Sequence, residues 1–215
     1  KRFLMKIEVV ELHNFRQFKG EAKLSFSVHE DNNVTVVHGS NGSGKTSLLN
    51  AFKWCFYGET DFDTQTDSIL NEAAIDESSV DAEIELSVKV VFLYEDRRHY
   101  VVRQQNFKKV GALAVESVGP EVFTLDAEDA EGITARADMP GSVMLSILPE
   151  KLQPYFFFNG ERIEKLGSAT NASQIRDAIK NLSGLELVHR GIRHLGKAGI
   201  GLQKLHGDLG DKEVR

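Results

Sequence analysis

The sequence contains little cysteine, proline or tryptophan, and it lacks any long apolar run. Among its 215 residues there are one cysteine, four prolines and one tryptophan. The single Cys55 excludes a disulfide framework and a structural zinc site, and it suits a reducing compartment. No apolar run approaches the ~20 residues of a membrane-spanning helix. The acids Glu8 and Glu11 also interrupt the start before a signal-peptide core forms. We therefore expect a cytoplasmic protein without a membrane partner.

The chain also lacks a basic excess. Lysine and arginine number 26 against 32 aspartates and glutamates, which gives a net charge of −6. There is thus no global signature of nucleic-acid binding. The basic residues do gather in one strip, at Arg97, Arg98, Arg103, Lys108 and Lys109. The strip could contact a phosphate backbone, although solvated surface is the more common role of such charges.

The clearest motif is the octapeptide Gly39–Thr46, GSNGSGKT, which matches the P-loop pattern G-x-x-x-x-G-K-[ST]. Glycines allow successive backbone N–H groups to turn toward phosphate oxygens, and the helix that follows adds its positive end. Lys45 is expected to reach the β- and γ-phosphates and to act in catalysis, and Thr46 to offer a hydroxyl to Mg²⁺. The candidate ATP-binding residues are Gly39, Asn41, Gly42, Ser43, Gly44, Lys45, Thr46 and Ser47.

The flanks of the motif have the composition that a P-loop needs. Val34, Val36 and Val37 predict a buried strand before the loop. After the loop, apolar residues recur at helical spacing and predict a helix with one apolar face, which includes Cys55 as a small core residue. Strand, glycine loop and helix in this order predict a nucleoside triphosphate site.

Alternating apolar residues predict several further strands. Two early strands, at 5–12 and 22–28, flank a turn at 14–20 that carries an exposed Arg16. A surface loop is expected at 59–79 and a helix at 140–148. Later strands are expected at 82–90, from Tyr100 onward, at 122–125 and at 133–136. The predicted fold class is α/β, with a mixed sheet around the P-loop helix and an adjoining antiparallel β layer.

Two segments allow both a functional and a structural interpretation. The run from Val90 to Asp96 could be a Walker B strand, but its order Tyr-Glu-Asp followed by two arginines favours a hairpin turn. The aromatic run 155–158 predicts a buried strand. The Asn-Gly-Glu-Arg sequence after it, 159–162, could be a functional loop or a plain turn.

The order NFRQFKG, GSNGSGKTSLLNAFKWCFYG and FFFNGERIEKL resembles the amino-terminal part of ABC-type ATPase heads in the SMC, Rad50 and RecF superfamily. Within that superfamily, the aromatic run that ends in FFFNGE resembles the DndD-like ATPases of DNA phosphorothioate modification. The resemblance implies that Arg16 approaches the phosphates and that Asn159 occupies the Q-loop position. There Asn159 would serve catalysis and reach Mg²⁺ directly or through water. Leu182–Leu185 (LSGL) echoes the family signature, but its place favours a structural turn.

The resemblance also implies an organisation. Residues 1–195 would form one lobe of the head, with a helix at 174–195 leading toward a coiled coil and a flexible tail at 196–215. ATP and Mg²⁺ would be bound here, with little turnover until a missing carboxy-terminal half completes the head. The head would form a homodimer around ATP and act with DNA and with other DNA-modification or defence proteins.

Three alternatives stay open. The chain could be the head of another repair or anti-phage defence ATPase of the superfamily, with the same site and other partners. A P-loop kinase would need a second substrate pocket and an arginine-rich lid. A DNA-binding module that works without nucleotide would show steep salt dependence, and the net acidity speaks against it.

Overall fold

The protein is described by a computed structural model, which covers residues 5–60, 68–129 and 131–157. The chain divides into two compact units, Lys1–Phe158 and Asn159–Arg215, and all of these residues belong to the first. The Asn159 loop, the predicted helix at 174–195, the Leu182–Leu185 turn and the predicted tail lie outside the described residues.

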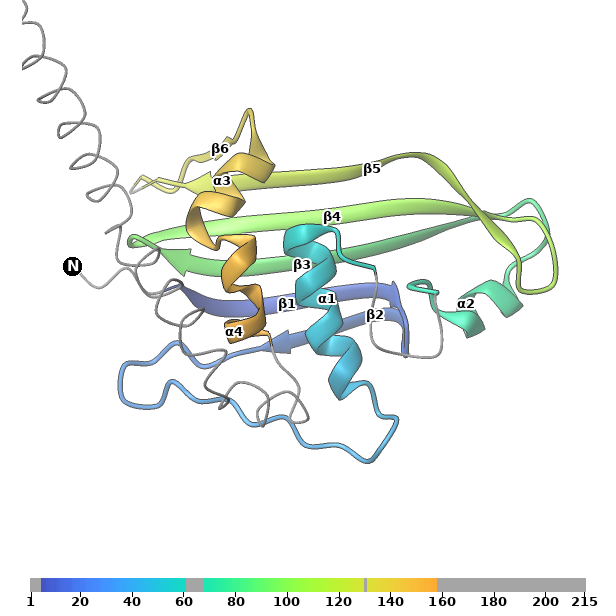
Figure 1. The fold of residues 1–215 in the computed structure, drawn as a ribbon, viewed down its shortest axis with the longest axis horizontal. Coiled ribbons are helices and arrows are strands. Elements are labelled where there is room, and N and C mark those ends of the chain that lie inside the picture. The colour runs from blue at the N-terminus through green and yellow to red at the C-terminus, as the bar shows by residue number, and fades with distance from the viewer. Residues whose placement is uncertain (1–4, 61–67, 130, 158–215) are drawn as a thin grey trace, which may run out of the picture. The chain divides into compact units, whose positions relative to one another are not determined.

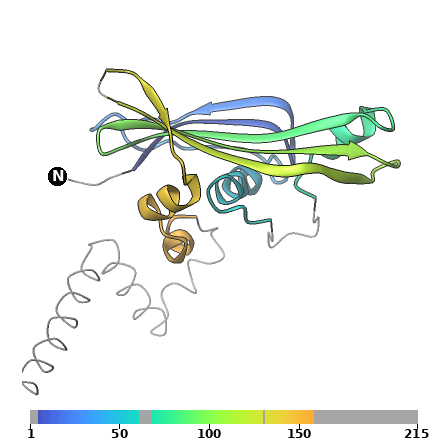
Figure 2. The same ribbon diagram turned by 90° about the horizontal axis from the view of Figure 1, so that it is seen from above.

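One antiparallel sheet of six strands is the frame of the described unit, and its strand order is β2-β1-β3-β4-β5-β6 (Figure 1). Its strands are β1 (Lys6–Phe15), β2 (Phe18–Ser25), β3 (Glu83–Tyr94), β4 (Arg97–Lys109), β5 (Val115–Glu128) and β6 (Thr134–Arg136). The helices α1 (Lys45–Tyr57), α3 (Pro140–Ile147) and α4 (Gln153–Phe156) pack on one face of this sheet (Figure 2).

The long strands follow directly from the alternation in the sequence. In β3, Ile84, Leu86, Val88 and Val90 are buried under the helices, while the residues between them face the other side. The turn from β3 to β4 consists of Glu95 and Asp96, both with positive φ (52° and 61°), as tight antiparallel hairpins require. The run Val90–Asp96 is therefore a hairpin, as the residue order indicated, and not a Walker B strand.

Two sequence predictions about the sheet are wrong in detail. The early hairpin and the later meander share one sheet, in which every strand pairing in the described residues is antiparallel, rather than forming two layers. Val34, Val36 and Val37 do not form a buried strand: they lie outside the strands and are exposed by 76%, 67% and 40%. In the described residues no strand pairs with them, so their β propensity has no partner to satisfy it.

The P-loop helix α1 is the centre of the hydrophobic core. It begins after Gly44 and ends at Gly58, and both glycines adopt positive φ (97° and 70°). Its buried apolar side chains extend beyond a single helix face: Leu48, Ala51, Phe52, Trp54, Cys55 and Phe56 are all buried. Cys55 is a core residue, as expected, and burial raises the pKa of its thiol to about 12. It is therefore no nucleophile at neutral pH.

The remaining helices correct two further predictions. The expected surface loop at 59–79 contains a short helix, α2 (Glu72–Glu77), whose N-cap Asn71 accepts a hydrogen bond from Ala74 N. The aromatic run at 155–158 does not begin as a strand. A 3₁₀ turn, η1 (Glu150–Leu152), leads into α4, because Pro154 occupies the first turn of that helix, where proline is favoured. The expected helix at 140–148 is confirmed as α3.

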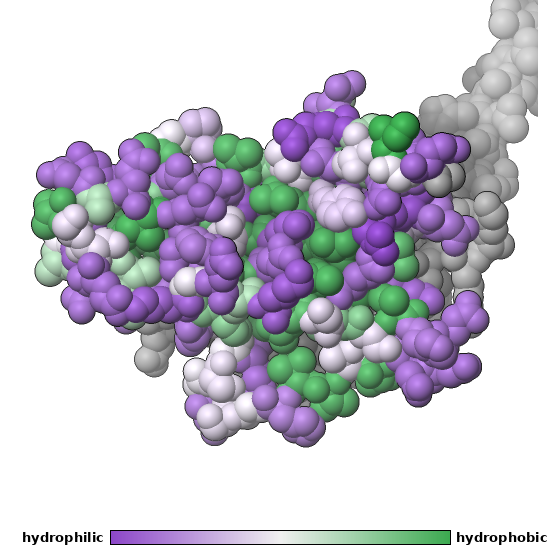
Figure 3. All heavy atoms as spheres, turned by 180° about the vertical axis from the view of Figure 1, so that it is seen from behind, coloured by the Kyte–Doolittle hydropathy of each residue, from purple (hydrophilic) through white to green (hydrophobic). Residues whose placement is uncertain are grey.

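The sheet face turned away from the helices is mainly hydrophilic around a central apolar area (Figure 3). Ion pairs cross it between strands: Arg98 of β4 binds Glu8 of β1 through Nε (2.6 Å) and Nη2 (3.2 Å). Glu11 of β1 pairs with Lys23 and Lys89 on its two neighbouring strands. This face carries charges of both signs in compensated pairs.

Candidate functional site

The P-loop is folded as a compact turn around its own lysine. Gly42 and Gly44 have positive φ angles (81° and 97°), which residues with a Cβ rarely adopt. Ser43 N donates to Ser40 O (3.2 Å), and Lys45 Nζ donates to the carbonyl oxygens of Gly39 and Ser40 (2.7 Å each). The ammonium group is thus held over the loop, where an anion placed in the loop would meet it.

The first turn of α1 offers donors at the same place. The first helical hydrogen bond runs from Leu48 N to Gly44 O (2.8 Å), so the amides of Lys45, Thr46 and Ser47 come before the helical ladder begins. Such amides, together with the positive end of the helix, attract phosphate. The Lys45 and Thr46 residues are exposed, as are Gly39–Ser43. The predicted loop residues are therefore gathered around one open, donor-rich surface.

Arg16 is buried, contrary to the sequence prediction of an exposed arginine. Only 8% of the residue is exposed, and burial lowers the pKa of its guanidinium. Its backbone adopts a positive φ of 48° and is fixed on two sides: Arg16 N donates to Ile69 O (2.9 Å), and Asn71 Nδ2 donates to Arg16 O. The sequence missed this because the anchoring segment lies more than fifty positions away in the chain.

The turn that carries Arg16 touches the start of the P-loop helix. The Ser47 hydroxyl donates to Oε1 of Gln17. The ring of Phe18 lies so close to Gly44 that a Cβ there would meet its Cζ at 3.0 Å. The structure thus brings the Arg16 turn against the start of the P-loop helix, while the approach of Arg16 to the phosphates stays a prediction. Gln17 and Phe18 were missed, because the resemblance gave a role in the NFRQFKG segment to Arg16 alone.

The other end of α1 is held by an arginine from the predicted basic strip. Arg103 Nε of β4 donates to Cys55 O (3.0 Å), and its Nη1 pairs with Glu121. Its guanidinium lies 4.2 Å from the centroid of the Phe123 ring. The last turn of α1 has no basic residue of its own, so Arg103 supplies the cation that a helix carboxyl end favours.

Most residues of the basic strip make contacts with other residues of the same chain. Arg98 binds Glu8, Lys108 pairs with Asp81 (2.7 Å), and Lys109 Nζ donates to the carbonyl oxygens of Asp76 (3.1 Å) and Ser78 (2.7 Å). These contacts and that of Arg103 leave Arg97 as the strip residue for which the structure gives no such contact. The strip is therefore no ready phosphate-binding surface.

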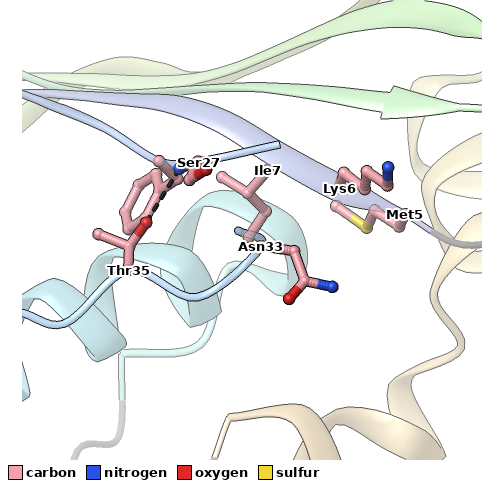
Figure 4. A pocket seen from close by; sticks show the side chains of 7 residues that line it. Met5, Lys6, Ile7, Ser27, Asn33 and Thr35 are labelled. Atoms are coloured by element: carbon pink, nitrogen blue, oxygen red, sulfur yellow. Dashed lines mark hydrogen bonds between the residues drawn. The ribbon is translucent and has the colours of Figure 1, made fainter. Parts of the chain in front are cut away.

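A pocket of about 300 Å³ lies apart from the loop. It is lined by Met5 and the start of β1 (Lys6, Ile7), by Phe26 and Ser27, and by Asn33 and Thr35 (Figure 4). Ser27 N donates to the Thr35 hydroxyl (2.9 Å) at its edge. None of the predicted site residues lines this pocket, so it is not the nucleotide site that the motif defines.

The residues that the structure describes contain no group of three or more His, Cys, Asp or Glu side chains placed to hold a metal ion. Thr46, exposed in the first turn of α1, nevertheless fits the way Mg²⁺ is held beside a nucleotide, by one or two protein oxygens together with substrate phosphates. In the same described part, no helix is long and apolar enough to cross a membrane.

Comparison with known proteins gives the family. A family model described as an AAA domain matches residues 10–195. A 60-residue segment is 43% identical to the DNA double-strand break repair Rad50 ATPase of Halobacterium salinarum. That segment is 28% of this chain and only 6% of the relative's length.

A solved structure titled "Structural biochemistry of ATP-driven dimerization and DNA stimulated activation of SMC ATPases" is also similar. The likeness has a TM-score of 0.48 at 18% identity, and it covers 81% of this chain and 99% of that one.

The α/β fold class predicted from the sequence is confirmed, and the loop before α1 matches the P-loop pattern of nucleoside triphosphate-binding proteins. The chain belongs to the AAA domain family, whose model covers it from β1 onward.

Proposed function

We propose that this chain binds ATP with Mg²⁺ at Gly39–Ser47 and forms part of an ATPase head. The observation that carries the proposal is the arrangement of Lys45 and the first amides of α1 around one exposed loop. Lys45 leaves its two carbonyl partners for the β- and γ-phosphates, and Thr46 supplies a hydroxyl to Mg²⁺. The loop amides from Asn41 to Lys45 hold the phosphates, and the buried cation Arg16 adds positive charge beside them.

We also propose that hydrolysis is completed from outside the described lobe. The one apolar run that could have supplied a Walker B acid, Val90–Asp96, is a hairpin. Asn159, which lies outside the described residues, would contribute at the Q-loop position to Mg²⁺ and the attacking water. Val34 and Val36, shortly before the P-loop, are exposed and could contact a further part of the head. That part would be the carboxy-terminal half, within a homodimer around ATP.

The biological setting is proposed from the residue motifs. FFFNGE after the P-loop favours a DndD-like role in DNA phosphorothioate modification, in the cytoplasm and with DNA and other modification proteins as partners. The alternative is another SMC, Rad50 or RecF-like repair or defence ATPase, for which the Rad50 similarity speaks. A DNA-binding module that works without nucleotide is disfavoured, because the basic strip is engaged in internal contacts.

Nucleotide binding is tested by titrating the chain with a fluorescent ATP analogue in the presence and absence of Mg²⁺. We expect saturable, Mg²⁺-dependent binding that Lys45→Ala weakens by about tenfold or more, because a charge-assisted contact to phosphate is lost. Thr46→Ala should reduce the difference in nucleotide affinity between the titrations with and without Mg²⁺. Arg97→Ala, an exposed cation of the sheet, is the control and should bind normally. Equal binding by wild type and Lys45→Ala would refute the proposed site.

Turnover and setting need separate measurements. Phosphate release by the pure chain should stay at background, and sustained release would refute the composite head. Two gene-level observations would separate the candidate roles: a second half with a signature motif supports the superfamily head, and neighbouring sulfur-transfer genes support the DndD-like role. DNA binding at low salt that ignores ATP would favour the binding module instead.

A further inference from the structure

We infer that Gln17 is a positioning residue of the nucleotide site. Its side-chain carbonyl accepts the Ser47 hydroxyl and so fixes the first turn of α1 against the turn that carries Arg16. The inference rests on the proposed nucleotide binding at the P-loop and extends it to a residue to which the sequence analysis gave no role. Gln17 would act through Ser47 and not by touching the nucleotide.

The first support is the state of Ser47 itself. The residue is 4% exposed, and its only hydroxyl proton is donated to Gln17. A hydroxyl has a single donor, so this group cannot at the same time donate to a phosphate oxygen. The Ser47 amide, in contrast, precedes the helical ladder, which begins with the bond from Leu48 N to Gly44 O. The geometry therefore assigns the amide of Ser47 to phosphate binding and its hydroxyl to Gln17.

The second support is the packing beside that hydrogen bond. Gly44 has a φ of 97°, and a Cβ built on it would meet Phe18 Cζ at 3.0 Å and Gln17 Cβ at 3.6 Å. The Arg16 turn thus fits closely against the glycine that ends the loop. Gln17 and Phe18 thus contact the helix start at two points, Ser47 and Gly44.

The third support is that the turn is itself fixed from behind. Asn71 N donates to Asn14 O (2.8 Å), and Asn14 Nδ2 donates to Glu85 O of β3 (3.0 Å). Asn14 Oδ1 accepts from Gly20 N (2.9 Å) on the returning strand. The turn is therefore an anchored part of the sheet, and Gln17 transfers this fixed position to the helix start. Donors held in place before the ligand arrives lower the cost of ordering on binding.

The test removes the acceptor while keeping the size of the side chain. Gln17→Met should weaken binding of the fluorescent ATP analogue by about threefold to tenfold, the range expected for one lost hydrogen bond. Ser47→Ala should weaken it similarly. In the Ser47→Ala background, Gln17→Met should have no further effect, because both substitutions remove the same bond. Gln104→Met, on the outer face of β4, is the matched control and should bind as wild type does.

The outcomes separate this inference from the proposed function. If wild type and Lys45→Ala both fail to bind, the proposed function falls. If wild type binds and Lys45→Ala does not, but Gln17→Met binds normally, only the role of Gln17 is overturned. The role of Gln17 would also be overturned if Gln17→Met weakened ATP binding equally in the wild-type and in the Ser47→Ala background. Leu125→Val, a mild core truncation in β5, controls for stability: it should lower the melting temperature without weakening ATP binding.

Discussion

At the scale of single residues, polar side chains hold the two ends of the P-loop helix, and a titratable histidine lies beside the β3–β4 hairpin. Gln17 meets the helix at its amino end, and Arg103 at its carboxyl end. His99, beside the β3–β4 turn, stacks on Phe92 with ring centroids 5.1 Å apart and planes 3° apart. Gln17 and Arg103 owe their roles to partners 30 and 48 positions away in the chain, whereas His99 meets Phe92 across the β3–β4 hairpin.

Arg103 should be a main contributor to stability. Arg103→Met removes a charged hydrogen bond to Cys55 O, the pair with Glu121 and the contact with Phe123, and we expect a loss of about 2–3 kcal/mol in the free energy of unfolding. Arg97→Met, an exposed neighbour, should change it by less than about 0.5 kcal/mol. Urea unfolding followed by circular dichroism measures both, and equal losses would contradict the assigned role.

His99 should make stability depend on pH. Burial is the main cause of the lowered pKa of its imidazole, outweighing the backbone bond to Arg97 O (3.1 Å). The folded state therefore favours the neutral ring. The unfolded chain takes up the proton first, so stability is full above the usual value of 6.5 and falls as pH drops from there toward the lowered folded pKa.

The measurement is the melting temperature of wild type and of His99→Phe between pH 7 and pH 5, a range set by the usual pKa of about 6.5. Phenylalanine preserves the stack on Phe92 but does not titrate. Wild type should lose more stability than the variant as the pH falls. Parallel curves would show that His99 is not the titrating group.

At the scale of elements, aromatic packing joins α1 to the segment that ends at residue 157. The Phe157 ring stacks on Phe52 with centroids 5.9 Å apart and lies 5.9 Å from the ring of Phe56. Tyr57 Oη donates to Leu148 O (3.2 Å), which ties α1 to the end of α3 as well. Phe157 is thus held against the P-loop helix.

Phe157→Ala should therefore destabilise the fold by about 3–4 kcal/mol, because it opens a cavity between α1 and α4. The matched control is Phe156→Ala. Its side chain is the same size, but the residue is 49% exposed, so the loss should be about 0.5 kcal/mol or less. Guanidinium unfolding of the two variants checks this, and a larger loss for Phe156→Ala would reverse the assignment of the buried face.

At the scale of the whole molecule, the described unit has a packed core on one side of its sheet, whereas the segment before the P-loop exposes apolar side chains. Val10, Leu12, Phe15, Trp54 and Phe92 are nearly or fully buried in one core. Val34 and Val36, in contrast, are exposed by 76% and 67%. Under the proposed composite head, these exposed valines are candidates for the contact with the rest of the head.

Replacing both valines by threonine should leave the stability of the chain alone within about 0.5 kcal/mol, because no buried contact is lost. Under the proposed composite head, the same change should abolish ATP hydrolysis when the chain is mixed with the carboxy-terminal half. Val80→Thr, exposed by 61% elsewhere, is the control and should hydrolyse normally. Full activity of the double variant would show that the valines are not the contact surface.

The sequence alone determined the features that depend on local patterns. The P-loop and its helix, the β3–β4 hairpin, α3 and the core position of Cys55 are where the residues predicted them, since glycine geometry and apolar periodicity act over a few positions. The predicted roles of the loop residues and of Asn159 stay predictions.

Tertiary structure decided what depends on distant partners. It joined all the described strands in one antiparallel sheet, buried Arg16 under the segment that contains Asn71, and engaged Arg98, Arg103, Lys108 and Lys109 in internal contacts. It also turned the start of the aromatic run into a helix and left the valines before the P-loop exposed. In each case the burial or pairing of a residue depends on partners that are distant in the sequence. Local propensity within a short window does not contain that information.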